Sequence, residues 1–147
     1  MSKSKDIGTR AETAVRNHLL SAGYSELEAH RNVLKGTADE GDVWLREKTH
    51  GLIVFEIKGG KSAKEASHGQ VLKWFAEADT ERFNAKAEYG FLVVQRGGVG
   101  YPRAGEWWAY AKLSDLHVIA GFDYQKSYAE SPIVRLTLTE LVKLING

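Results

Sequence analysis

Two carboxylates and one lysine have the types and the spacing that metal-assisted phosphodiester hydrolysis requires. Glu56 and Lys58 stand at the end of an apolar run, residues 52–55, where a turn would be the usual sequel. Because side chains alternate between the two faces of a strand, Glu56 and Lys58 point the same way and Ile57 points into the core. If Asp42 lies on the neighbouring antiparallel strand, the three polar groups converge on one metal-sized space.

This set of groups matches what the reaction needs. Hydrolysis of a phosphodiester requires an activated water and stabilisation of charge on the phosphate and the leaving oxygen. Mg²⁺ prefers oxygen ligands, commonly one or two carboxylates with waters and substrate phosphate. Asp42 and Glu56 fit as the carboxylates, and the carbonyl of Ile57 is a candidate third ligand. Lys58 is placed to orient or activate the water, or to offset negative charge. The residues therefore predict a Mg²⁺-dependent nuclease, and Mn²⁺ is expected to substitute.

The same spacing has plainer interpretations that the residues leave open. Glu56 and Lys58 would also suit a solvated strand end with an ordinary ion pair. Asp39 competes with Asp42 as the metal ligand, but Asp42 directly precedes an apolar strand, whereas Asp39 falls in a turn region. The five histidines form no closely spaced pair and the chain has no cysteine, so zinc sites and disulfides are not expected.

Composition predicts one folded domain over residues 1–147. The chain has 147 residues, of which 43% are hydrophobic, and only two prolines. The net charge of +1 neither favours nor excludes DNA binding, because the distribution of charge matters more than its sum. No apolar run approaches the roughly 20 residues that span a bilayer. We therefore expect no membrane association and a cytoplasmic location.

Hydrophobic periodicity predicts a mixed α/β fold. The expected helices cover residues 10–22, beginning at a capping box, then 66–88, 114–119 and 139–145. The expected strands cover residues 32–34, 43–45, 52–58, 91–94, 107–110 and 133–136. This order predicts a mixed central β-sheet flanked by helices.

The motif and its surroundings resemble the PD-(D/E)XK nuclease superfamily. The resemblance lies in residues 41–43 followed by 54–58. Further matches at residues 8–12, 74–78 and 93–98 resemble one branch, the small Holliday junction resolvases of actinobacteriophages, which are related to archaeal junction-resolving enzymes. The resemblance covers about residues 7–118 as the nuclease core and leaves about 119–147 as a C-terminal extension. It implies a restriction-endonuclease-like core of order α-β-β-β-α-β.

The resemblance also implies roles for individual residues. Asp42 and Glu56 would hold the metal, Lys58 would be the catalytic lysine, and Glu12 would be a further acid near the metal-bound water. Gln70, followed by Trp74, resembles a Q-x-x-x-Y element in which the glutamine approaches the site, although tryptophan replaces the tyrosine. Each of these residues also has a simpler interpretation. Glu12 would cap the first helix, Gln70 would be a solvated helix residue, and Trp74 would be part of the core. Glycine at position 41 replaces the proline that usually precedes the first catalytic aspartate.

The substrate that the resemblance implies is branched DNA, above all four-way junctions cut by paired nicks. Since such a junction has approximate two-fold symmetry, a homodimer is expected, in the host cytoplasm if the protein is encoded by a phage. Two alternatives remain: a less selective nuclease acting on flaps, branched DNA or single strands, and a non-catalytic DNA-binding module. The expected phosphate contacts come from basic residues near the proposed site, namely Arg10, Arg31, Lys35, Lys61, Lys64, Arg96 and Arg103.

Overall fold

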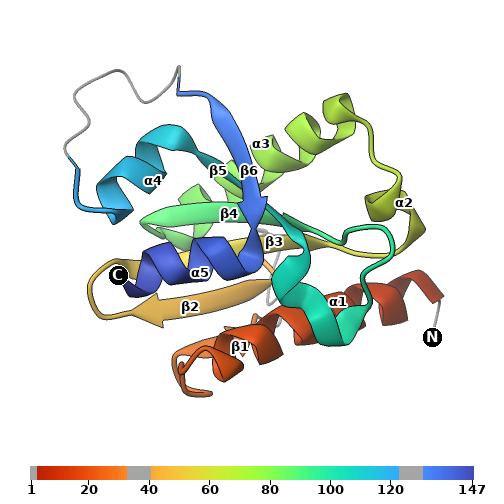
Figure 1. Ribbon diagram of the computed structural model, residues 1–147, viewed down its shortest axis with the longest axis horizontal. Coiled ribbons are helices and arrows are strands. Elements are labelled where there is room, and N and C mark those ends of the chain that lie inside the picture. Colours follow the sequence, from red (N-terminus) through yellow and green to blue (C-terminus); the bar gives the residue numbers. More distant parts are fainter. Residues whose placement is uncertain (1–2, 33–40, 123–130) are drawn as a thin grey trace.

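The computed structural model describes residues 3–32, 41–122 and 131–147. Lys35 and Asp39 therefore lie outside the described residues, as does most of the strand expected at residues 32–34. Within the described part, the chain is an α/β protein whose six-stranded mixed sheet is flanked by helices (Figure 1). This confirms the predicted class of fold.

The strands follow one another across the sheet in sequence order. Only the pair β3–β4 is parallel among the described strands, and every other neighbouring pair is antiparallel. A parallel pair needs a crossover connection, and α2 and α3 supply it. The strands are β1 (Ala29–Arg31), β2 (Val43–Glu47), β3 (Gly51–Lys58), β4 (Tyr89–Val94), β5 (Trp108–Lys112) and β6 (Ile133–Thr137). The helices are α1 (Lys3–Ser21), α2 (Lys61–Lys64), α3 (His68–Ala85), α4 (Leu113–Ile119) and α5 (Leu138–Asn146), with a 3₁₀ helix, η1 (Tyr101–Glu106).

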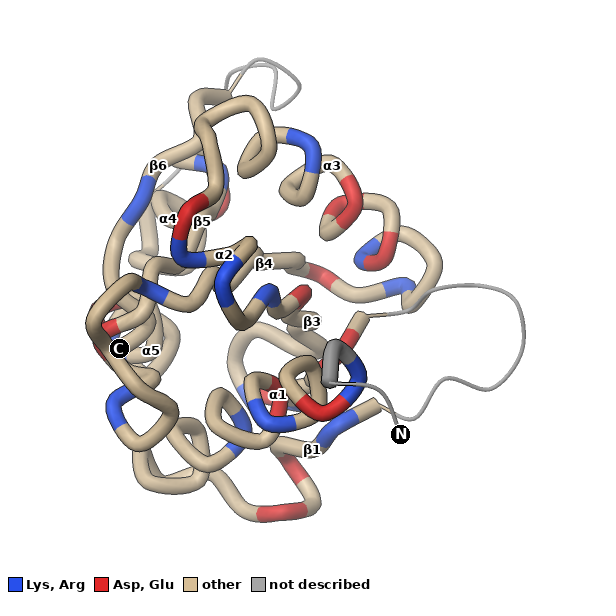
Figure 2. The backbone as a smooth tube through the Cα atoms, turned by 90° about the vertical axis from the view of Figure 1, so that its right-hand side faces the viewer, with Lys and Arg blue, Asp and Glu red and all other residues tan. Residues whose placement is uncertain are grey.

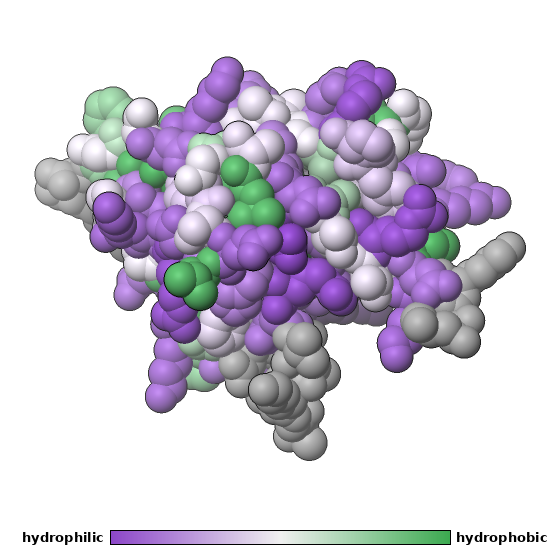
Figure 3. All heavy atoms as spheres, turned by 90° about the horizontal axis from the view of Figure 1, so that it is seen from below, coloured by the Kyte–Doolittle hydropathy of each residue, from purple (hydrophilic) through white to green (hydrophobic). Residues whose placement is uncertain are grey.

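Two apolar layers cover the two faces of the sheet. In β4, Phe91 and Val93 belong to the larger cluster, which α1, α4, α5 and η1 complete. Leu92 and Val94 point the other way and pack under α3. Figure 1 shows the same arrangement, with α1 and α5 in front of the sheet and α3 behind it. The lower side of the molecule, as oriented in Figure 1, is predominantly hydrophilic with small separate hydrophobic patches (Figure 3).

Helix α1 is longer than the sequence predicts. It begins at Lys3, so the capping box expected at residues 9–12 is wrong and lies inside the helix. The helix extends past Thr9 because Ile7 packs against Gly60, at the turn that follows β3: a Cβ on Gly60 would come within 2.8 Å of Ile7. The helix ends before Gly23, whose φ of +110° suits a C-terminal stop, as expected.

Local sequence sets the ends of the other long helices. The hydroxyl of Ser67 accepts a hydrogen bond from the amide of Gln70 and caps α3. Thr137 and Glu140 form a reciprocal capping box at the start of α5. Residues 119–147, expected as an extension, thus complete the sheet with β6 and the larger cluster with α5. No described helix combines the length and the apolar character needed to cross a bilayer.

The contact between α1 and the end of β3 provides a test of the packing. A Cβ on Gly59 would lie 2.6 Å from the Cβ of Ala11, so Gly59→Ala forces the helix away from the strand. We expect it to lower the free energy of unfolding by about 1–3 kcal/mol, measured by urea denaturation. Gly97→Ala is the matched control, because nothing lies within 4 Å of the added carbon. Equal stability of the two variants would contradict this packing.

Candidate active site

The register of β2 on β3 brings Asp42 beside Glu56. Val43 pairs with Phe55, so Asp42 immediately precedes the paired part of β2, as predicted. Its amide donates to the carbonyl of Phe55 at 2.9 Å, and its carboxylate Oδ2 accepts from the amide of Ile57 at 2.8 Å. The Asp42 side chain is therefore oriented by the same strand that carries Glu56.

Gly41 adopts a backbone conformation that accounts for the absence of the proline expected from the sequence resemblance. Its φ of +91° lies in the left-handed region, whereas proline is fixed near −65°. A Cβ at this position would also lie 3.1 Å from the Cβ of Val54. The chain enters Asp42 through a conformation that proline cannot adopt.

Glu56 is a buried acid among other acids. Its side chain is only 6% exposed and lies on the face of the sheet that α3 covers. Burial raises its pKa to about 7, and a hydrogen bond and negative charge from Glu81 act in the same direction. A hydrogen bond with Asp42 and the charge of Lys58 oppose the shift. These carboxyl groups thus share a space in which negative charge lacks full compensation.

Lys58 lies between acids from the sheet and from α3. Its Nζ is 3.4 Å from Oε2 of Glu56 and 3.4 Å from Oε2 of Glu77, and 5.5 Å from the ring centre of Trp74. Burial opposes the charged form, but the two carboxylates outweigh it and raise the pKa of Lys58. The ammonium group is therefore held as a cation, over the strand end that carries Glu56.

Glu12 approaches the site from α1. It lies in the middle of the helix, so its interpretation as a capping residue is wrong. Its Oε1 accepts from both Nε and Nη2 of Arg31, at 3.1 and 3.0 Å. Burial and the negative charge of Asp42 raise the pKa of Glu12, while Arg31 opposes the shift. Glu12 and Arg31 thus form an ion pair whose field reaches Asp42.

Helix α3 contributes two acids that the sequence analysis missed, Glu77 and Glu81. With Gln70 and Trp74 they follow a 4-3-4 spacing, which places all four on one face of the helix. Because Gln70 and Trp74 were expected at the site, the same helical spacing could have predicted Glu77 and Glu81 from the sequence. Gln70 lies one turn before Trp74, and its backbone amide donates a hydrogen bond to the hydroxyl of Ser67, the residue that caps α3. No described hydrogen bond or ion pair joins the Gln70 side chain to Asp42, Glu56 or Lys58.

Two of the expected DNA-contacting residues come directly after the strand that carries Glu56 and Lys58. Lys61 and Lys64 are exposed on α2, directly after β3. Figure 2 looks onto this side and shows positions of both charges gathered around β3, between α1 and α3.

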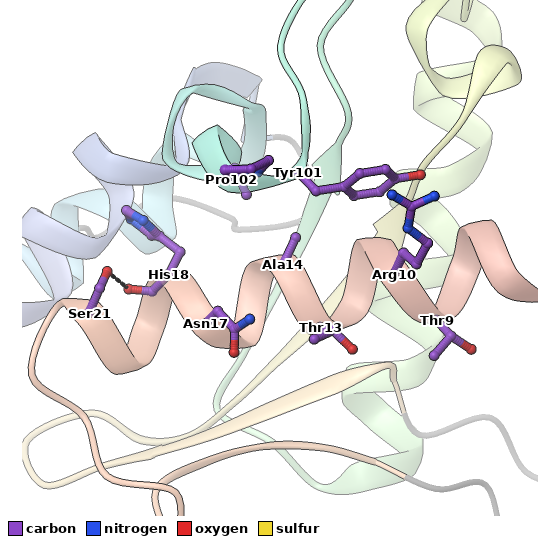
Figure 4. Close-up of a pocket in the computed structure, with 10 residues that line it drawn as sticks. Thr9, Arg10, Thr13, Ala14, Asn17, His18, Ser21, Tyr101 and Pro102 are labelled. Atoms are coloured by element: carbon purple, nitrogen blue, oxygen red, sulfur yellow. Dashed lines mark hydrogen bonds between the residues drawn. The ribbon is translucent and has the colours of Figure 1, made fainter.

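Two other expected contacts are engaged within the protein. Arg103 forms a bidentate ion pair with Glu106, at 2.7 and 2.8 Å. Arg10 stacks on Tyr101, with its guanidinium carbon 4.3 Å from the ring centre, at one end of an open groove between α1 and η1 (Figure 4).

The donor set fits a hard divalent cation held by few protein ligands. No group of three or more histidine, aspartate or glutamate side chains within the described ranges is arranged as a metal cluster. Mg²⁺, however, usually takes only one or two carboxylates and keeps several waters. Asp42 and Glu56 are two oxygen-bearing acids within hydrogen-bonding distance. A cation between them would compensate the negative charge of the carboxylates, so that Glu56 would no longer need to keep a proton.

No family model, no curated protein and no solved structure gives a significant match to this chain. The function of the protein is therefore inferred from the geometry of this site and from the sequence motif.

The pKa of Glu56 predicts how stability depends on pH. Between the ordinary value of 4.5 and about 7, the folded state keeps a proton that the unfolded state loses. Stability therefore falls as pH rises through this window, by up to about 3 kcal/mol, and the loss is complete above it. In EDTA, Glu56→Gln should remove this part of the pH dependence, measured by urea unfolding at pH 5 and pH 8. Parallel pH profiles of the variant and the wild type would contradict the burial of an ionisable acid here.

Proposed function

We propose that the protein is a Mg²⁺-dependent endonuclease that hydrolyses DNA phosphodiesters, with Mn²⁺ able to substitute. One observation carries this proposal: Asp42, Glu56 and Lys58 meet at one end of β3. There the backbone amide of Ile57 donates a hydrogen bond to the carboxylate of Asp42. Two acids facing a phosphate would repel it unless a cation lay between them. A protein that only bound DNA would gain nothing from this arrangement, which favours catalysis over simple binding.

Asp42, Glu56 and the Ile57 carbonyl would hold the metal. When bound, Mg²⁺ supplies charge stabilisation at the phosphate and makes a bound water more acidic. The amide of Ile57 fixes the orientation of the Asp42 carboxylate, and burial under α3 fixes Glu56. Both acids are thus oriented by the fold, which limits the rearrangement needed when substrate enters.

Lys58 supplies the positive charge next to these acids. Glu56 and Glu77 hold its ammonium group from two sides, and the face of Trp74 limits its movement. From there it donates a hydrogen bond to the attacking water or to a phosphate oxygen, and it offsets the negative charge that grows as the water attacks. Arg31, held by Glu12, adds a second cation on the other side of Asp42.

The substrate we propose is a four-way DNA junction, cut by two symmetric nicks. This part rests on the sequence resemblance, and the order α1-β1-β2-β3-α3-β4 is consistent with a restriction-endonuclease-like core. Two cuts related by a two-fold axis call for two active sites, so we propose a homodimer. Phosphate contacts from Lys61, Lys64 and their basic neighbours would give affinity without reading sequence.

Substitution of the three central residues tests the chemistry. We expect Asp42→Asn, Glu56→Gln and Lys58→Ala each to reduce the rate of cleavage at least about a hundredfold, because each removes a group that binds or stabilises charge at the reacting phosphate. Junction binding measured by gel shift should stay close to that of the wild type.

Lys112→Ala is a matched control for Lys58→Ala. Lys112 is as exposed as Lys58 and pairs with an α3 carboxylate, Asp79, at 3.3 Å, but it lies at the far end of β5. The control should cleave like the wild type. Full activity of Lys58→Ala would show that the proposed mechanism is wrong.

The choice of substrate is tested separately. A synthetic four-way junction, a linear duplex, a flap and a single strand are each incubated with Mg²⁺ and with EDTA. Paired, symmetric, metal-dependent nicks in the junction alone are expected. Equal cutting of all branched and single-stranded forms would keep the chemistry and replace junction resolution with a less selective activity.

A further inference from the structure

A tryptophan outside the site carries two arginines on its ring. Trp108 begins β5, Arg96 follows β4 and Arg135 lies on β6. The guanidinium carbons of Arg96 and Arg135 lie 4.1 and 3.9 Å from the centre of the Trp108 ring. Because β5 lies between β4 and β6, the two arginines reach the indole from the two strands that flank β5. We call these three residues the arginine–tryptophan cluster.

The cluster concentrates positive charge that no ion pair within the described residues neutralises. Neither arginine pairs with an acid there, and Arg96 makes only a long 3.5 Å hydrogen bond to the carbonyl of Glu106. The carboxylate of Glu106 senses the charge of Arg96 but is already paired with Arg103. Two like charges held close together repel each other, and stacking of each guanidinium on tryptophan offsets part of this repulsion. The indole thus holds both cations in place at a site that an anion would stabilise.

The sheet places this cluster in line with the proposed active site. Lys58 pairs with Val94, and Val94 pairs with Trp108, so the three residues form one row across β3, β4 and β5. Paired residues share a face of the sheet, and neighbouring strands are about 4.8 Å apart, so the backbone of Trp108 lies roughly 10 Å from that of Lys58. On a nucleic acid this separation corresponds to a few phosphates along one strand.

We propose that the arginine–tryptophan cluster binds the phosphodiester backbone of the DNA arm next to the scissile phosphate, an inference that rests on the proposed nuclease function. The two guanidinium carbons lie 4.1 and 3.9 Å from the ring centre and so occupy the indole on which a base would otherwise stack. The cluster therefore binds phosphates and is indifferent to sequence. Arg135 is exposed and borders an open hollow next to Tyr110, so the strand has access to it.

The proposal gives the C-terminal segment a role beyond packing. Arg135 belongs to residues 119–147, which lie outside the sequence resemblance. Strand β6 carries this arginine to the Trp108 ring, over which Arg96 also lies. The C-terminal segment would thus widen the DNA-contacting surface from the end of β3 across the sheet to its edge.

Binding measured against salt tests the cluster. Fluorescence anisotropy with a labelled four-way junction is recorded in EDTA from about 50 to 300 mM NaCl. We expect Arg96→Gln and Arg135→Gln each to raise Kd about five- to tenfold and to reduce the salt slope of log K by about 1. Arg135→Lys, which keeps the charge, should retain most of the slope.

Arg46→Gln is the matched control. Arg46 is also an exposed arginine stacked on a tryptophan, 5.6 Å from the centre of the Trp44 ring, but it lies on β2 toward the opposite end of β3. It should bind DNA like the wild type. Two results would overturn the cluster proposal: a Kd and a slope like those of the wild type in Arg96→Gln and Arg135→Gln, or a higher Kd with an unchanged slope. If the wild-type protein still cleaved DNA, the proposed nuclease function would stand. A wild-type protein that neither binds nor cuts DNA would overturn the proposed function itself.

Discussion

The hydrogen bond from the amide of Ile57 to the carboxylate of Asp42 is the contact on which the site depends. It joins the segment entering β2 to the strand that carries Glu56 and Lys58, at the last paired residues of the two strands. A shift of one residue in this register would turn Glu56 and Lys58 toward the core and Ile57 toward α3. The apolar residues of β3 resist such a shift, because Phe55 and Ile57 are buried in one cluster and Val54 lies on the other face. The packing that stabilises the sheet therefore also fixes the geometry of the acids.

The charged groups at this end of the sheet come from the sheet itself, from α1 and from α3. Asp42 and Glu56 come from the sheet, Glu12 from α1, and Glu77 and Glu81 from α3. Lys58 and Arg31 compensate part of this charge through ion pairs. Burial raises the pKa of Glu56, and the negative charge of Glu81 acts in the same direction, so the protein alone does not fully stabilise the charged form of this acid. A divalent cation would stabilise that charged form, which is the physical ground on which we propose a metal site here and not a solvated strand end.

Sequence patterns predicted the parts of the fold that depend on interactions between residues close together in the chain. The apolar run before Glu56 and Lys58 was sufficient to predict β3 and the direction of both side chains, because alternation is a property of the strand itself. The start of α1 could not be predicted, because it depends on Ile7 packing against Gly60, far along the chain. The 4-3-4 spacing places Glu81 on the same face of α3 as Gln70 and Trp74, but its approach to Glu56 depends on how α3 lies on the sheet. The cluster around Trp108 needs three strands to be adjacent, which no local pattern reveals.

Crystals soaked in Mn²⁺ would test the central claim most directly, because manganese scatters anomalously and its position can be seen without reference to activity. An anomalous peak between the carboxylates of Asp42 and Glu56, within reach of the Ile57 carbonyl, is the expected result, and Glu56→Gln crystals should lose it. Absence of a peak at this position at millimolar Mn²⁺, or a peak elsewhere that persists in Glu56→Gln, would contradict the assignment of these acids as the metal site.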